Sequence, residues 1–235
     1  MSNRTIYFAI IADRRTGSTM LRKTLNQHPQ IHCSGEIFNS FTAVDGCKNN
    51  EVDYARTMGA FWEWRRSEHP DTASSIGTSI HRWQAGLFPG LWELTKEVHS
   101  RFICLYRENL LRHFLSEMIA MKTGKWSCDP THVENLAKVY VDPIALDLFI
   151  QTRRREQAED WRFQCRIEYP LERLVENWEV ESTRIQHFLG VTPQPLTMAT
   201  QKQETRLLSK AIDNYEEVAE LVKQLGHPEW LDPGV

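Results

Sequence analysis

The feature that most constrains the fold is an apolar strand that leads into a helix through one short polar turn. Residues 7–11 (YFAII) form an unbroken apolar run, which is typical of a strand covered on both faces of a parallel sheet. Residues 18–27 carry apolar side chains at three- and four-residue spacings, which predicts an amphipathic helix. The turn between them, ADRRTGS, directs backbone N–H groups at the space beyond the sheet. Such a place attracts anions.

Strand-like and helical segments alternate along the rest of the chain, which predicts an α/β fold with a mainly parallel sheet and helices on both faces. The C-terminal third is expected to be rich in helix. The chain contains no repeats and no Gly/Ser linker, so a single domain spanning residues 1–235 is predicted. Strands are expected near residues 6–11, 31–34, 75–80, 101–106 and 165–168, and helices near 18–27, 51–68, 91–98, 109–124, 142–161, 171–188 and 206–225.

Composition narrows the class of protein. The net charge of −3 over 235 residues argues against a general nucleic-acid binder. The cysteines are odd in number and lack C-x-x-C spacing, which predicts buried thiols in a reducing compartment. No secretory segment or membrane-spanning apolar run is apparent, so a cytoplasmic location without membrane insertion is expected. The oligomeric state is left open, with a homodimer as one alternative. The five cysteines are Cys33, Cys47, Cys104, Cys128 and Cys165.

A strand–loop–helix unit also suggests a nucleotide kinase or ATPase. The phosphate loop of those enzymes requires G-x-x-x-x-G-K-[ST]. Here Gly17 is followed by Ser18 and Thr19 with no lysine, and the chain has no G-x-G-x-x-G. A kinase is therefore disfavoured but kept as an alternative.

The order Arg15, Thr16, Gly17, Ser18, Thr19 resembles the 5′-phosphosulfate loop of sulfotransferases that use 3′-phosphoadenosine 5′-phosphosulfate (PAPS). The longer stretch RTGSTMLRKTLNQHPQI is similar to carbohydrate sulfotransferases and their bacterial relatives, in which N-x-H-P follows the helix. This resemblance implies a P-loop-type three-layer sandwich. It also implies that Arg15 bridges the 5′-phosphate and the sulfonate, while the backbone from residue 16 to residue 19 holds the phosphate.

A second stretch, RFICLYRENLLRHFLS, resembles the 3′-phosphate motif of the same family. The resemblance assigns the phosphate contact to Arg107, at the end of a strand, and to Ser116, in the following helix. The spacing is nine residues where the family has about eight, which leaves open whether Arg112 shares the contact. Lys202 stands where the family has a mobile loop over this phosphate. A weaker match, RIEYPLERLVENWEVESTRIQHFLGV, extends the resemblance toward the C-terminus.

The resemblance implies in-line transfer of a sulfonate from PAPS to an acceptor hydroxyl with the help of a general base. The acceptor is expected to be a carbohydrate, a glycolipid or another small metabolite, and Arg15 to contribute to catalysis. Two bases compete: Glu36 in CSGEIF and His81 in TSIHRW. Glu36 is favoured because the resemblance is closer to the bacterial enzymes. A non-catalytic nucleotide binder is a further alternative, because Ser79 stands near the place of a lysine found in relatives.

Several neighbouring residues have two interpretations. Arg14 is expected at the surface or in a salt bridge rather than in catalysis. The aromatic residues Phe61, Trp62, Trp64 and Trp83 either line an acceptor pocket or pack in the core, with packing favoured. The nine histidines lack the paired spacing of metal ligands, so no metal site is predicted.

Overall fold

The computed structural model describes residues 5–38, 59, 62–64, 69–87, 90–126, 137–200 and 206–232. The chain divides into two compact units, residues 1–106 with 161–199 and residues 107–160 with 200–235. Each unit is described by itself. The expected helix over residues 51–68, the positions of Cys47 and Cys128, and Lys202 fall wholly or mostly outside the described residues.

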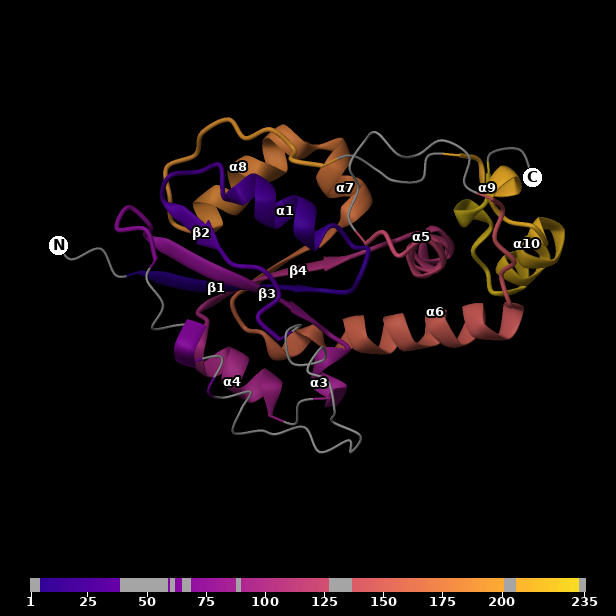
Figure 1. The fold of residues 1–235 in the computed structure, drawn as a ribbon, viewed down its shortest axis with the longest axis horizontal. Coiled ribbons are helices and arrows are strands. Elements are labelled where there is room, and N and C mark those ends of the chain that lie inside the picture. The colour runs from indigo at the N-terminus through magenta and orange to yellow at the C-terminus, as the bar shows by residue number, and fades with distance from the viewer. Residues whose placement is uncertain are drawn as a thin grey trace. The chain divides into compact units, whose positions relative to one another are not determined.

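The first unit is built on five parallel strands in the order β2-β3-β1-β4-β5 (Figure 1). The predicted parallel sheet is therefore confirmed. The strand expected near residues 75–80 is a fully buried strand, β3, that pairs with both β1 and β2. The strands are β1 (Ile6–Ala12), β2 (Ile31–Cys33), β3 (Ser75–His81), β4 (Arg101–Tyr106) and β5 (Arg166–Pro170).

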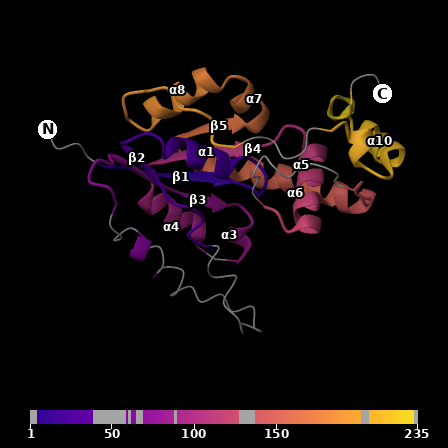
Figure 2. The ribbon, with the colours of Figure 1, turned by 45° about the horizontal axis from the view of Figure 1, so that its top comes forward.

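Helices cover both faces of this sheet, as predicted, and alternate residues of β1 supply the two cores (Figures 1 and 2). Successive side chains of a strand point to opposite faces. Phe8 and Ile10 pack in the core that contains α1, α7 and α8, whereas Ala9 and Ile11 pack in the core that contains α4. The helices of this unit are α1 (Ser18–Leu25), α3 (Gln84–Leu87), α4 (Leu91–Val98), α7 (Leu171–Glu176), α8 (Trp178–Phe188) and the 3-10 turn η3 (Glu159–Arg162).

The helix predicted over residues 171–188 is interrupted, which corrects the sequence-based expectation. Asn177 lies between α7 and α8 with φ −111° and ψ 33°, outside the helical range. Its side-chain amide donates to the carbonyl of Arg173 at 3.3 Å. The backbone N–H of Asn177 donates to the same carbonyl at 3.0 Å, so this helical hydrogen bond is kept and the break consists of the backbone angles of one residue. The short helix α3 was not predicted.

The second unit is helical. Asp142 caps α6 by accepting hydrogen bonds from the N–H groups of Ile144 and Ala145, and Gly124 ends α5 with φ 68°, both as predicted. The last predicted helix is divided, because the Asn214 side chain pairs with the N–H and the carbonyl of Val141. The elements are α5 (Leu110–Thr123), α6 (Pro143–Ala158), α9 (Leu208–Ala211), α10 (Tyr215–Gln224) and the 3-10 turn η4 (Pro228–Trp230).

The cysteines only partly match the expectation of buried thiols. Cys33 and Cys104 are buried, whereas Cys165 is exposed. Burial raises the pKa of the Cys33 thiol to about 12, against a smaller opposing effect of Arg22. Cys33 is therefore an inert member of the core rather than a nucleophile.

Candidate active site

The anion loop lies between β1 and α1 and has an unusual backbone. Arg15 adopts a positive φ of 64°, and Gly17 a φ of 89°. Gly17 is also the residue before α1, and no side chain caps the helix there. The N-terminus of a helix without a side-chain cap presents N–H groups and a partial positive charge. The loop thus has the geometry that holds an anion through its backbone.

The Thr16 side chain faces into the loop. Its hydroxyl donates to the carbonyl of Asp13 at 2.7 Å and accepts from the N–H of Asp13 at 3.2 Å, and the residue is completely buried. Thr16 therefore stabilises the turn. A contribution to anion binding would come from its backbone or from its neighbours.

A buried ion pair supports this loop from below. Arg82 Nη1 donates to Asp13 Oδ2 at 3.0 Å and to the carbonyl of Leu105 at 2.9 Å. The two side chains are 2% and 5% exposed, so the charges are almost fully withdrawn from water. The pair ties the residue after β3 to the residue after β1. The sequence reasoning assigned no role to it, although both residues directly follow strands whose carboxyl ends meet at one edge of the sheet.

Glu36 and His81 come together at the same edge of the sheet. His81 Nε2 lies 3.2 Å from Glu36 Oε1, with side-chain exposures of 5% and 22%. The segment that carries Glu36 is fixed to β3, because the Thr78 hydroxyl donates to the carbonyl of Gly35 at 2.8 Å. The two bases considered as alternatives are thus direct neighbours. A carboxylate in contact with an imidazole can accept a proton from a bound hydroxyl group.

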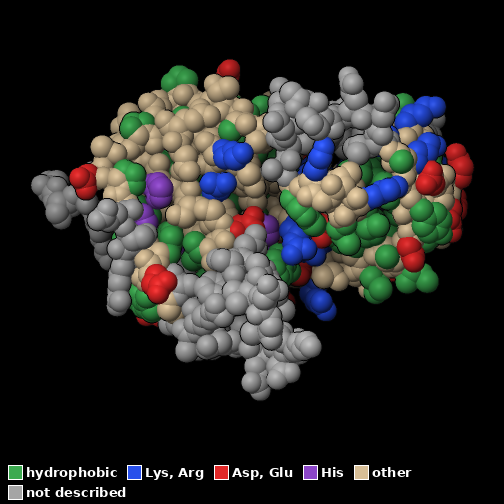
Figure 3. Space-filling model, in the orientation of Figure 1, with side chains coloured by type: hydrophobic (Ala, Val, Ile, Leu, Met, Phe, Trp, Pro, Cys, Tyr) green, Lys and Arg blue, Asp and Glu red, His purple; other side chains and the backbone are tan. Residues whose placement is uncertain are grey.

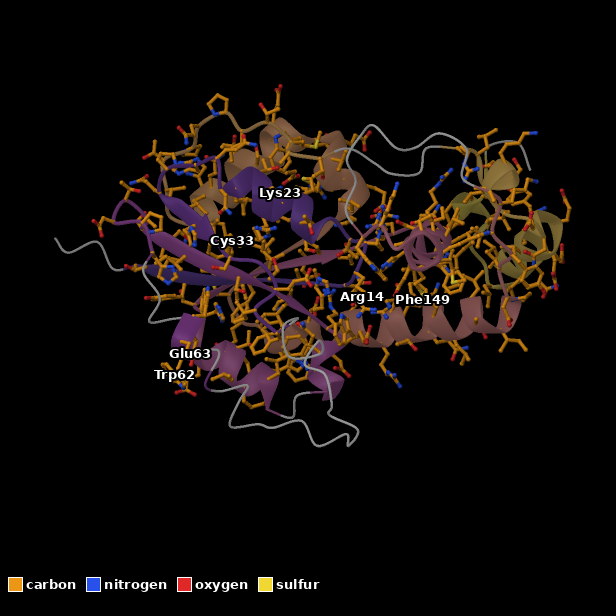
Figure 4. The ribbon with its side chains drawn as sticks, in the orientation of Figure 1. Arg14, Lys23, Cys33, Trp62, Glu63 and Phe149 are labelled. Atoms are coloured by element: carbon orange, nitrogen blue, oxygen red, sulfur yellow. The ribbon has the colours of Figure 1, made fainter. Side chains whose placement is uncertain are left out.

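Arg14 and Trp83 complete this part of the unit. The indole Nε1–H of Trp83 donates to His81 Nδ1 at 3.2 Å. The Arg14 guanidinium lies 4.5 Å from the centre of the Trp83 ring, in a cation–π arrangement. Figure 4 labels Arg14 beyond the carboxyl ends of the strands. Trp83 is half-buried and contacts one of the two predicted bases, whereas Trp64 is buried in the core as expected.

The residues of the predicted 3′-phosphate motif lie in the second unit. Arg107 directly follows β4, and its Nη1 donates to the carbonyl of Arg112 at 3.2 Å. The guanidinium of Arg112 reaches the carbonyl of Arg206 at 3.3 Å and Asp232 Oδ1 at 3.5 Å. Ser116 lies one turn after Arg112 on α5, and residues four apart share a helix face. The motif thus forms one local group of two cations and a hydroxyl.

Over the second unit, Figure 3 shows basic side chains interspersed with acidic ones on the face in view. Among the described residues, no three or more His, Cys, Asp and Glu side chains are grouped to hold a metal ion. None of the described helices has the length and apolar character needed to span a membrane.

Comparison with known proteins finds no matching family model. The chain is 30% identical to Nodulation protein H of Rhizobium meliloti over 121 residues, which are 51% of this chain and 49% of that protein. It is 27% identical to Nodulation protein H of Rhizobium tropici over 51% of this chain and 48% of that protein. The chain thus matches about half the length of these two relatives. With the protein from Rhizobium meliloti strain 1021 it shares 24% identity over 90% of this chain and 89% of that protein.

Two solved structures are also similar. A sulfotransferase from Alicyclobacillus acidocaldarius matches with a TM-score of 0.48 and 13% identity, covering 97% of this chain and 98% of that one. A sulfotransferase domain from the curacin biosynthetic pathway matches with a TM-score of 0.48 and 12% identity, covering 95% and 98%.

Proposed function

We propose that this chain transfers a sulfonate group from PAPS to a hydroxyl group of a carbohydrate or another small metabolite. The observation that carries the proposal is the pairing of two features in the first unit. An anion loop with a left-handed Arg15 and Gly17 opens α1, and a Glu36–His81 contact of 3.2 Å lies at the same carboxyl edge of the sheet.

The reaction assigns a distinct task to each group. The acceptor oxygen attacks sulfur while the bond from sulfur to the bridging phosphate oxygen breaks, and that oxygen keeps the electron pair. Arg15 and the N–H groups at the start of α1 stabilise the negative charge that grows there. Arginine stays protonated, so it acts as a donor of hydrogen bonds and not as an acid. The acceptor proton goes to the Glu36 carboxylate, and 3′-phosphoadenosine 5′-phosphate leaves.

The second unit would recognise the 3′-phosphate. Arg107, Arg112 and Ser116 offer the cationic fork and hydroxyl that suit a phosphate, and Lys202 stays a prediction because it lies outside the described residues. These groups would distinguish PAPS from ATP, which has a hydroxyl group at the 3′ position.

Calorimetric titration with 3′-phosphoadenosine 5′-phosphate, with 5′-AMP and ATP as comparison ligands, tests the donor site. We expect the 3′-phosphorylated nucleotide to bind more tightly than the other two. Arg107→Ala should lower the affinity for it by about tenfold or more, which is the usual effect of losing a charged hydrogen bond. Arg155→Ala is the matched control, because Arg155 is an exposed arginine of the same unit. Stronger binding of ATP would favour the kinase alternative.

Turnover tests the catalytic assignment. Glu36→Gln keeps the shape of the side chain and removes its basicity, so we expect it to abolish sulfonate transfer while nucleotide binding persists. A wild-type protein that binds the nucleotide but transfers sulfonate to no acceptor in a broad hydroxyl screen would instead be the non-catalytic binder.

A further inference from the structure

We propose that Trp83 is a positioning residue that fixes the tautomer of His81, so that the imidazole carries its ring proton on Nε2, beside the Glu36 carboxylate. This inference rests on the proposed function for its catalytic meaning, but the tautomer itself is a property of the folded chain. Three contacts carry it: Trp83 to His81, His81 to Glu36, and Arg14 to Trp83.

The first step concerns the His81 Nδ1 atom. The indole nitrogen of tryptophan is a donor only, and Trp83 Nε1 lies 3.2 Å from His81 Nδ1. Nδ1 must therefore offer a lone pair. A neutral imidazole with its lone pair on Nδ1 carries its proton on Nε2.

The second step follows from where Nε2 lies. It is 3.2 Å from Glu36 Oε1, but the two atoms are not aligned for a hydrogen bond. With the ring proton on Nε2, the lone pair that His81 would need as the base is on Nδ1, where it is already used by Trp83. The arrangement therefore favours Glu36 as the group that takes the acceptor proton.

The third step explains why the indole is held firmly. The Arg14 guanidinium lies over the Trp83 ring at 4.5 Å. The backbone of His81 is also anchored, because its main-chain N–H donates to Gln84 Oε1 at 2.8 Å. A cation over the ring face fixes the plane of the indole and thereby the direction of its N–H. Arg14 belongs to the anion loop, so the loop and the base are connected through Trp83.

Selective ¹⁵N labelling of histidine tests the inference directly. The His81 signals are assigned by their loss in His81→Gln. In wild type we expect two separate ring-nitrogen signals, a protonated Nε2 and an unprotonated Nδ1. In Trp83→Phe, which keeps an aromatic ring for Arg14 but lacks the N–H, we expect the two signals to move together as the tautomers mix.

Trp92→Phe is the matched control. Trp92 also lies under an arginine, Arg162 at 5.6 Å, and packs against Phe163, but its ring contacts are in the core of the α4 face. We expect Trp92→Phe to leave the His81 spectrum unchanged. Sulfonate transfer, where an acceptor is known, should fall about fivefold in Trp83→Phe with the KM for nucleotide unchanged, because one neutral hydrogen bond is lost.

Two results would overturn the proposal. One is a wild-type spectrum in which Nδ1 carries the proton, which requires no variant to fold. The other is a Trp83→Phe spectrum identical to wild type. Absence of sulfonate transfer would count against the proposed function and leave the tautomer assignment standing, so the two failures are distinguishable.

Discussion

Two arginine–aspartate pairs, one in each unit, show how the same chemistry serves different ends. The Arg82–Asp13 pair is 3.0 Å long with side chains 2% and 5% exposed. The Arg112–Asp232 pair is 3.5 Å long, and Arg112 is 35% exposed. A buried arginine whose Nη1 donates both to Asp13 and to the carbonyl of Leu105 is a structural element. A longer contact with a partly exposed arginine leaves that guanidinium able to turn toward a ligand, which fits the role proposed for Arg112.

Arg82→Met should produce the largest effect, because it leaves the Asp13 carboxylate buried without its cation. Loss of one partner of a buried pair costs about 3–5 kcal/mol. Urea denaturation followed by circular dichroism measures the change. The double variant Asp13→Asn/Arg82→Met should recover part of the stability. A single variant as stable as wild type would show that the pair does not support the loop.

Gly17→Ala should come next and should act mainly on binding. The residue has φ 89°, and an added Cβ would lie 2.5 Å from Leu171 Cδ1. A left-handed conformation costs an alanine about 1–2 kcal/mol. The displaced loop should weaken the binding of 3′-phosphoadenosine 5′-phosphate by about tenfold. Gly124→Ala is the control, since Gly124 has φ 68° with no atom within 4 Å of an added Cβ. Gly124→Ala should lose stability but keep its affinity for the nucleotide. Equal losses of affinity in Gly17→Ala and Gly124→Ala would contradict the assignment of the loop as the anion site.

Asp232→Asn tests the second pair through pH. Burial acts to raise the pKa of Asp232, but the N–H groups of Ser209 and Leu208, the Ser209 hydroxyl and Arg112 together lower it. A depressed pKa in the folded state means stability that is present above the unfolded value, near 4, and is lost as the pH falls through the folded value. Wild type should therefore lose more stability than Asp232→Asn on acidification. Parallel acid-denaturation curves would contradict this.

Arg112→Gln should have the smallest effect on stability. A partly exposed ion pair contributes about 0–1 kcal/mol, so the denaturation midpoint should hardly move. The affinity for 3′-phosphoadenosine 5′-phosphate should nevertheless fall, as calorimetry would show. A large loss of stability with unchanged affinity would make Arg112 a structural residue like Arg82 and remove the contrast between the two pairs.

The sequence predicted those parts of the fold that depend on local pattern. The apolar runs identified β1 and β4 to within a residue, and the Asp142–Pro143 cap identified the start of α6, although the helix ends three residues before the predicted end. The break at Asn214 was missed because its side chain pairs with Val141, 73 residues away, a partner that only the folded chain supplies. The break at Asn177 was missed because it consists of one residue with non-helical backbone angles in an otherwise helical stretch.

The site divides in the same way. The loop and the candidates Glu36 and His81 were predicted from motifs; in the structure His81 is the last residue of β3, and Glu36 follows the end of β2 by three residues. Arg82 was given no role, and Trp83 was expected to pack in the core. The partner of Arg82, Asp13, is 69 residues away and meets it only because β1 and β3 pair. The partner of Trp83, His81, is two residues away, and their contact depends on how the turn after β3 folds. The only sequence signal was the place of Arg82 and Trp83 in HRW, immediately after a strand, where charged and aromatic side chains gather around ligands.

The positive φ of Arg15 also has a consequence for engineering. A non-glycine residue in this conformation costs about 1–3 kcal/mol, whereas glycine adopts it freely. A library selected only for heat resistance should therefore enrich glycine or asparagine at position 15 and discard the guanidinium together with the strain. Thermostable variants obtained without a selection for turnover would then be well folded but inactive. The first position to change would show where the native residue lowers stability but is needed for the proposed reaction.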